Sequence, residues 1–156
     1  MFGDINITFT PSRHFSGRSY SSMGKCLWGG WAIKSFKENI WFSGDGGYGK
    51  HFEEIGKKLG PFDFGFIECG QYGKEWPQIH LFPNESVQAA IDAKVSVAVP
   101  IHWGAFNLSY EHSWHEPADK FIANCKKNSV AYATPEMGKV NYLTEQNNSW
   151  WRNFIK

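Results

Sequence analysis

Cysteine is scarce in this chain of 156 residues, and it shows no pattern typical of a metal site or a disulfide framework. The three cysteines are Cys26, Cys69 and Cys125. They are odd in number and widely spaced, without a Cys-x-x-Cys pair, which argues against both a set of disulfides and a structural zinc knuckle. We expect reduced thiols, with Cys26 and Cys69 acting as small hydrophobic residues within apolar runs.

Long apolar runs and an excess of one sign of charge are also lacking. No stretch approaches the roughly 20 apolar residues that span a bilayer, and residues 1–5 show no signal-peptide pattern. A cytoplasmic protein without a transmembrane segment is therefore expected. Sixteen Lys and Arg residues against fifteen Asp and Glu residues leave a formal net charge of +1. Nucleic acid is not an expected partner, because its binding depends on clustered basic side chains.

Aromatic residues, by contrast, are plentiful, with eight Trp and thirteen Phe residues in a length that fits a single domain. Such side chains favour half-buried sheet surfaces, so a sheet-rich core is expected. Strand-like and helix-like patterns alternate, which is typical of an α/β fold. Strands are expected at residues 6–10, 27–34, 39–43, 63–69, 95–101, 130–134 and 139–143. Helices are expected at residues 51–59, 84–93 and 117–127, followed by a polar and aromatic tail at residues 144–156.

Three residues that could bind metal each follow a strand-like segment: His14, Asp45 and His102. The glycines on both sides of Asp45 allow the chain to turn sharply there. Imidazole and carboxylate groups together suit zinc, and also iron or manganese. From the residues alone, hydrogen-bonded structural histidines and an ordinary Gly-Asp-Gly turn remain open as alternatives.

The sequences around these residues resemble the second half of the metallo-β-lactamase superfamily, in the branch around N-acyl-phosphatidylethanolamine phospholipase D. The resemblance implies an α/β (α+β) fold that is half of an αββα sandwich, with a mainly antiparallel sheet and helices on one face. It also implies that His14 binds one metal, Asp45 bridges two metals and His102 binds the other. The matching segments are Thr-Pro-Ser-Arg-His-Phe-Ser-Gly-Arg (10–18), Phe-Ser-Gly-Asp-Gly-Gly-Tyr (42–48) and Ile-His-Trp-Gly (101–104).

Members of that superfamily begin with a His-x-His-x-Asp-His motif, which this chain does not contain. The chain alone would then supply two ligands per metal, whereas catalytic zinc usually takes three from protein. Weak metal binding and weak activity are therefore expected. The implied function is metal-dependent hydrolysis of phosphodiester, phosphate-ester or lactone substrates, including lipid-like phosphoesters. The alternative is a non-catalytic fragment or structural module of the same fold.

The resemblance also points to residues of the substrate cleft. His80 matches a histidine that could donate a proton to a phosphate or a leaving group; an exposed loop histidine is the alternative. Tyr72 falls in Gly-Gln-Tyr where relatives tend to have Gly-Ala-Tyr, so Gln71 is a departure. Arg13 and Arg18 could bind a substrate phosphate or form salt bridges to nearby loops.

Half of a sandwich would leave one face of its sheet uncovered. Soluble monomers rarely expose a large contiguous apolar surface, so we expect a homodimer or association with the missing N-terminal half. The alternative is that loops and the tail around Trp150 and Trp151 fold over this face and leave a monomer.

Overall fold

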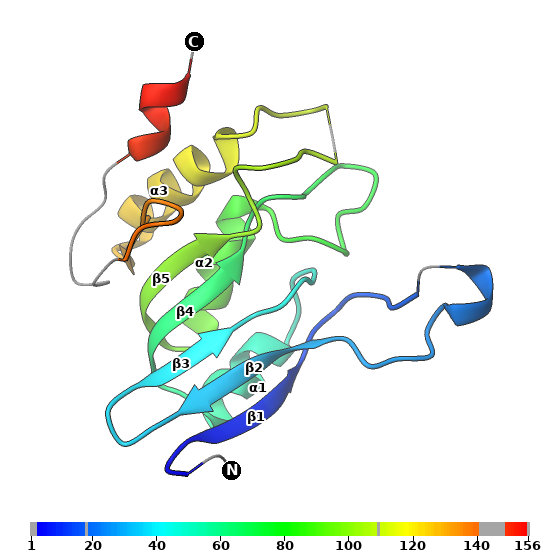
Figure 1. The fold of residues 1–156 in the computed structure, drawn as a ribbon, viewed down its shortest axis with the longest axis vertical. Coiled ribbons are helices and arrows are strands. Elements are labelled where there is room, and N and C mark those ends of the chain that lie inside the picture. The colour runs from blue at the N-terminus through cyan, green and yellow to red at the C-terminus, as the bar shows by residue number, and fades with distance from the viewer. Residues whose placement is uncertain (1–2, 18, 109, 141–148, 156) are drawn as a thin grey trace.

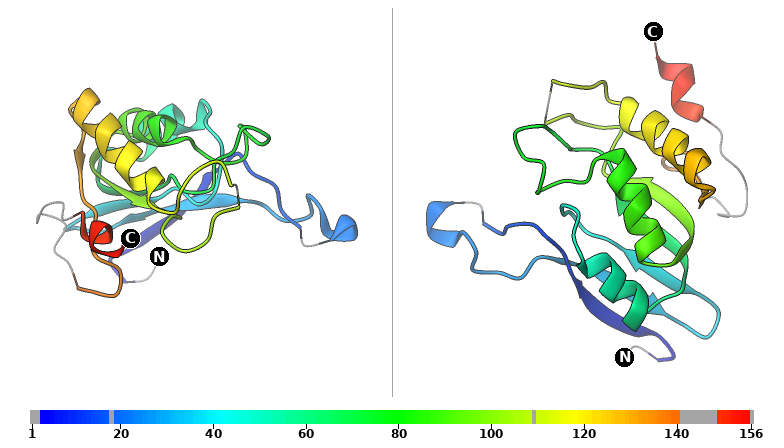
Figure 2. Two further views of the ribbon diagram at one scale, coloured as in Figure 1. Left: turned by 90° about the horizontal axis from the view of Figure 1, so that it is seen from above. Right: turned by 180° about the vertical axis from the view of Figure 1, so that it is seen from behind.

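The computed structural model describes residues 3–17, 19–108, 110–140 and 149–155, which form a six-stranded sheet with three α-helices on one of its faces (Figures 1 and 2). The order of the strands in the sheet follows their order in the chain. The strands are β1 (Asn6–Pro11), β2 (Gly29–Lys34), β3 (Asn39–Phe42), β4 (Phe62–Glu68), β5 (Val95–Ile101) and β6 (Ala131–Tyr132). The helices are α1 (His51–Lys58), α2 (Pro83–Asp92) and α3 (Glu116–Asn128), with short 3-10 helices at Tyr20–Ser22 and Trp150–Phe154.

The sheet is mixed, so the expectation of a mainly antiparallel sheet is wrong. β2 is antiparallel to β1 and to β3, whereas β3–β4, β4–β5 and β5–β6 are parallel pairs. The helices explain this, because each of them connects two consecutive strands from β3 onward, and such a crossover returns the chain in its original direction. Crossovers of this kind are right-handed. Since each new strand is added on the same side, all three helices lie on one face, as expected (Figure 2).

The expected elements up to residue 134 are all present, with ends displaced by no more than two residues. The last expected strand covers residues 139–143. Residues 139 and 140 are not part of a strand, and residues 141–143 lie outside the described residues. The first part of the expected tail, residues 144–148, is likewise outside them. Its last part forms the 3-10 helix Trp150–Phe154.

The core lies between the sheet and the helices. Trp41 is fully buried at its centre, with its ring centroid 5.7 Å from that of Phe52 on α1 and 6.0 Å from that of Phe62 on β4. Cys69 and Cys125 are buried free thiols, whereas Cys26 is exposed. Of the two cysteines expected to behave as hydrophobic residues, only Cys69 therefore does so.

The opposite face of the sheet carries two rows of apolar side chains that run across the strands, and we call it the open face. Its most exposed members lie on β1, β2 and β3, where Ile7, Phe9, Trp31 and Phe42 are each between 41% and 44% exposed. The helices cover only the other side (Figure 2). One row is Phe9, Trp31, Phe42, Phe66 and Val99, and the second is Ile7, Ile33, Ile40, Phe64 and Val97.

The described part of the tail packs elsewhere and does not cover the part of these rows on β1, β2 and β3. The indole N–H of Trp151 donates a hydrogen bond of 3.3 Å to Asp119 on α3, and Arg152 binds the same carboxylate at 3.3 Å. The ring of Trp151 lies 5.1 Å from that of Trp103, which follows β5. Residues 149–155 are thus held at the β5–α3 end of the sheet, away from β1 and β2 (Figure 1).

Candidate metal centre

Four strands end at one edge of the sheet, and residues with metal-binding side chains lie at or just after these ends. β3, β4 and β5 are parallel, and β1 runs in the same direction as β3 because both are antiparallel to β2. Ligands of sheets of this kind bind beyond the carboxyl ends of the strands. His14 follows β1, Asp45 follows β3, Glu68 ends β4 and His102 follows β5 directly.

These side chains meet around Glu68. The Nδ1 atom of His102 lies 3.4 Å from Oε1 of Glu68 and 3.7 Å from Oδ1 of Asp45. His80, from the loop after β4, hydrogen-bonds through its Nδ1 to the same Glu68 oxygen. The ring centroid of His80 lies 5.4 Å from that of His102 and 5.1 Å from that of His14. We call these five residues the histidine–carboxylate cluster: His14, Asp45, Glu68, His80 and His102.

Glu68 is fully buried and is held on all sides. Its second carboxylate oxygen accepts the N–H of Gly46 at 2.7 Å, and its backbone carbonyl accepts the hydroxyl of Ser86 at 2.6 Å. Burial raises the pKa of the Glu68 carboxyl, but the hydrogen bonds from His102 and His80 outweigh burial and place that pKa below its usual value. The structure therefore stabilises a charged carboxylate in the interior.

His102 has a strained backbone that is fixed by a close contact. Its φ is 66°, a left-handed conformation that residues other than glycine rarely adopt. Strain of this kind concentrates at functional sites. The carbonyl oxygen of His102 also lies so near Gly70 that a Cβ atom at position 70 would stand 1.6 Å from it. The hydrogen bond to Glu68 raises the pKa of His102, against the opposing effect of burial.

His14 presents a ring nitrogen suited to a metal. Its ring is stacked between Phe15 and Trp28, with both centroid distances 4.7 Å. Nδ1 lies 2.8 Å from the carbonyl oxygen of Phe15, to which it must donate, so Nε2 carries the lone pair. Nε2 is buried and has no hydrogen-bond partner among the residues that the structure describes. Metal-binding histidines are commonly oriented in this way, by a bond from the other ring nitrogen to a carbonyl group.

The donor groups of the cluster fit a metal ion. Glu68, His80 and His102 each offer one ligand atom, and these three atoms lie within 4.8 Å of one another. Two imidazoles and one carboxylate form a ligand set of catalytic zinc and of some iron enzymes. Besides His14, Asp45 and His102, the pair Glu68 and His80 therefore adds polar groups at this edge of the sheet.

Sequence reasoning missed Glu68, although the sequence contains a signal for it. Glu68 is the last residue of a strand whose neighbours are mostly apolar, and it lies next to the buried Ile67 and Cys69. A carboxylate is almost never buried without a partner, so a second polar group had to be near. His80 is that partner, and at 6% exposure it is a buried residue rather than an exposed loop histidine.

Of the other expected site residues, the structure describes Arg13 and Tyr72. The guanidinium of Arg13 donates to the carbonyl of Tyr48 at 3.0 Å and to the side chain of Gln78, so it ties two loops together. Tyr72 is buried and donates to Glu116 at 3.0 Å, in a cavity beside α2 and α3 that does not adjoin the cluster. Burial and this acidic neighbour raise the pKa of Tyr72. Arg18 lies outside the described residues.

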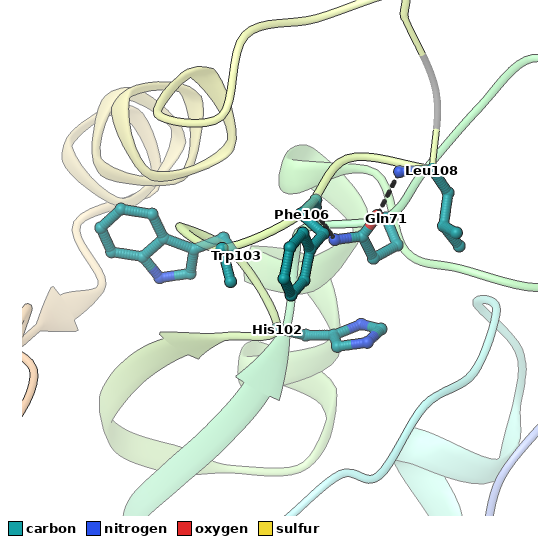
Figure 3. A pocket seen from close by; sticks show the side chains of 6 residues that line it. Gln71, His102, Trp103, Phe106 and Leu108 are labelled. Atoms are coloured by element: carbon teal, nitrogen blue, oxygen red, sulfur yellow. Dashed lines mark hydrogen bonds between the residues drawn. The ribbon is translucent and has the colours of Figure 1, made fainter.

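A cavity of about 300 Å³ adjoins His102 (Figure 3). Apolar side chains form most of its wall, and Gln71 lies at its base with hydrogen bonds to the loop that follows His102. A second cavity of about 350 Å³ also reaches His102, from the side of Phe66 and Met137. The lining residues of the first cavity are Gln71, His102, Trp103, Ala105, Phe106 and Leu108.

A family model for the beta-lactamase superfamily domain matches residues 1–103. The chain belongs to this family. An uncharacterized protein of Mycobacterium tuberculosis is 37% identical over 154 residues, which are 96% of this chain and 41% of that protein. The N-acyl-phosphatidylethanolamine-hydrolyzing phospholipase D 1 of Caenorhabditis elegans is 30% identical over 143 residues, which are 87% of this chain and 40% of that protein. The chain thus spans about two fifths of the length of these relatives.

Solved structures agree with this assignment of the family at the level of the fold. A metallo hydrolase from Ignicoccus hospitalis superposes with a TM-score of 0.63 at 16% sequence identity, covering 88% of this chain and 52% of that one. The expected metallo-β-lactamase-like α/β fold is therefore confirmed, as is the resemblance to the phospholipase D-like branch.

Proposed function

We propose that this chain contributes a metal centre for the hydrolysis of phosphodiester, phosphate-ester or lactone substrates. The observation that carries the proposal is the histidine–carboxylate cluster at the carboxyl ends of β1, β3, β4 and β5. It combines a buried Nε2 on His14, which has no hydrogen-bond partner among the described residues, with His102 and Asp45, whose Nδ1 and Oδ1 atoms lie 3.7 Å apart. Zinc fits these donors best, and iron or manganese also fit them.

In this proposal His14, Asp45 and His102 hold metal, and Glu68 orients His80 and His102. When bound, the metal would act as a Lewis acid and lower the pKa of a coordinated water. His80 is the proposed catalytic residue. Since its Nδ1 is engaged by Glu68, Nε2 is the nitrogen left to exchange a proton with a substrate oxygen.

The proposed substrate is small and lipid-like. One relative is named as a phospholipase D that hydrolyses N-acyl-phosphatidylethanolamine, and the cavity next to His102 is mostly apolar. Nucleic acid is a poor candidate because the formal net charge is only +1. No helix in the described part of the chain is long and apolar enough to cross a membrane. A cytoplasmic location is our proposal.

One observation favours a second candidate, a non-catalytic module of the same fold. The sequence contains no His-x-His-x-Asp-His motif, so the cluster offers fewer donors than two metals in a family site would need. Tight dinuclear binding and fast turnover are therefore not expected from this chain alone.

Zinc-dependent thermal unfolding tests the metal centre, and hydrolysis separates the two candidates. Zinc at about 100 times its Kd should add about 2.7 kcal/mol to the free energy of unfolding, and His102→Ala should abolish this gain. His115→Ala is the matched control, because His115 pairs with Asp119 on α3. An equal zinc effect in wild type and His102→Ala would contradict the proposed site. Zinc-dependent release of 4-nitrophenol from bis(4-nitrophenyl) phosphate supports the hydrolase, and zinc binding without any release supports the module.

We further propose that two copies of the chain associate through their open faces. The two rows contain no charged side chain. If each side chain has a surface of ~200 Å² and is weighted by its exposed fraction, the two rows together expose on the order of 600 Å². A standard interface buries about 800 Å² per partner, and a two-fold pair needs no other component. Ile7→Lys should yield a monomer in sedimentation equilibrium. Ile91→Lys on α2, a residue with a similar exposure of 42%, should not; a monomeric wild type would refute this association.

A further inference from the structure

The side chain of Gln71 forms two hydrogen bonds that hold the loop after His102 in place. Its amide nitrogen donates to the carbonyl of Phe106, and its amide oxygen accepts the N–H of Leu108 at 2.8 Å. Figure 3 shows both bonds beside the His102 ring. Gln71 itself is 8% exposed, and its backbone carbonyl accepts the indole N–H of Trp76 at 2.8 Å. The clamp is therefore anchored in the loop that follows β4.

The clamped loop presents apolar groups that have no cover among the described residues. Phe106 is 85% exposed and Leu108 is 64% exposed. Both line the cavity of about 300 Å³ that also contains the imidazole of His102, whose side chain is 35% exposed. Trp103 forms a further wall, and its indole N–H is already bonded to the carbonyl of Pro100 at 2.9 Å. A ligand in this cavity would therefore meet mainly carbon atoms, with a single imidazole at one end.

We propose that this cavity binds an alkyl or aryl substituent of the substrate, and that Gln71 is the positioning residue that shapes it. The inference rests on the proposed function for the reacting end, since it places an apolar group next to the ester or phosphate at the cluster. The size agrees, because ligand pockets begin at about 300 Å³ and are mostly apolar with few polar groups. Without the clamp, residues 105–108 would lose two hydrogen bonds to the body of the protein, and the wall of the cavity would move.

The first test examines the clamp itself and needs no metal. Chymotrypsin cleaves after aromatic residues and leucine, so limited digestion in EDTA reports whether the chain opens at Phe106 and Leu108. Gln71→Ala should be cut there at least several times faster than wild type. Gln88→Ala is the matched control, because Gln88 is exposed on α2 and its side-chain amide donates to Asp92 of the same helix. Equal cleavage of wild type and Gln71→Ala would refute the clamp.

The second test examines the ligand class, with inorganic phosphate, butyl phosphate and octyl phosphate as calorimetric probes, both with zinc and in EDTA. Each buried methylene contributes about 0.8 kcal/mol, or roughly fourfold in affinity. Wild type should therefore bind octyl phosphate at least tenfold more tightly than butyl phosphate under both conditions. Gln71→Ala should lose this preference while its affinity for inorganic phosphate is unchanged. Phe106→Ser, at an exposed position that tolerates replacement, should lose it as well.

The two tests distinguish failure of this inference from failure of the proposed function. If zinc does not strengthen the binding of inorganic phosphate, the proposed metal centre is wrong, while a chain-length preference in EDTA that depends on Gln71 still supports the apolar subsite. If wild type binds butyl and octyl phosphate equally, or if Gln71→Ala and Phe106→Ser both keep the preference, the subsite is refuted whatever zinc does.

Discussion

Replacing Glu68 by glutamine should destabilise the metal-free protein strongly, although the two side chains have nearly the same shape. The carboxylate accepts hydrogen bonds on both oxygens, from Gly46 N–H on one side and from His80 and His102 on the other. A carboxamide has one accepting oxygen and one donating nitrogen. If the nitrogen faces Gly46, two donors oppose each other. If the nitrogen faces the histidines, it is a donor, so the Nδ1 atoms of both rings must lose their protons in order to accept.

The expected loss follows from these bonds. Hydrogen bonds to a charged group contribute about 1.5–3 kcal/mol each, and a buried donor left unsatisfied costs about 1–3 kcal/mol. Allowing for partial relaxation, Glu68→Gln should lower the free energy of unfolding by about 2–4 kcal/mol. For a protein of this length that corresponds to a fall in Tm of about 5–15 °C. This is a large share of a total stability that is usually about 5–15 kcal/mol.

Urea unfolding in EDTA, followed by tryptophan fluorescence and by circular dichroism, would measure this loss. Glu53→Gln is the matched control: Glu53 pairs with Lys57 on the surface of α1, and exposed ion pairs contribute little to stability. A Glu68→Gln variant as stable as wild type, or more stable, would refute the reasoning. It would mean that burying the Glu68 charge destabilises the fold by more than its hydrogen bonds stabilise it. Glu68 would then serve to bind a ligand rather than to stabilise the fold.

Two further predictions concern the support of the site and the docking of the tail. Gly70→Ala should destabilise the protein by about 1–3 kcal/mol or more in the same urea assay, because its Cβ would overlap the carbonyl oxygen of His102; unchanged stability would show that β4 and β5 can separate at their ends. Burial raises the pKa of Asp119, but its bonds to His115, Trp151 and Arg152 outweigh this and lower that pKa. A lowered pKa means that its contribution is complete above the unfolded value of about 3.9 and is lost as the pH falls further. As the pH falls, residues 149–155 should therefore separate from α3, and the fluorescence of Trp150 and Trp151 should change in wild type but not in Asp119→Asn. Identical acid transitions in the two proteins would contradict this prediction.

The strands and helices could be predicted from the sequence because their signals are local. Alternation of apolar residues marks β1, and a near-continuous apolar run marks the buried β5. The predicted direction of pairing is wrong for the last three pairs of strands. Each of the last three connections contains a helix, and a helical connection between neighbouring strands indicates a parallel pair.

The candidate site could be predicted only where a ligand follows a strand directly. His14, Asp45 and His102 satisfy that condition, and a shared strand direction is enough to place them at one edge. His80 lies twelve residues after Glu68, at the end of an irregular loop. No periodic pattern describes the path of that loop, so the bond between these two residues depends on tertiary packing that the sequence does not display.

Gln71 and Tyr72 are adjacent in the sequence but lie in different surroundings. Both follow β4 at the edge where the cluster lies, and the family pattern drew attention to Tyr72. Gln71 lines the cavity at His102, whereas Tyr72 lies against Phe82 and donates to Glu116 on the side of the helices. The departure from the family pattern at Gln71 therefore falls on the residue that shapes the cavity, which is why substrate selectivity should be tested there first.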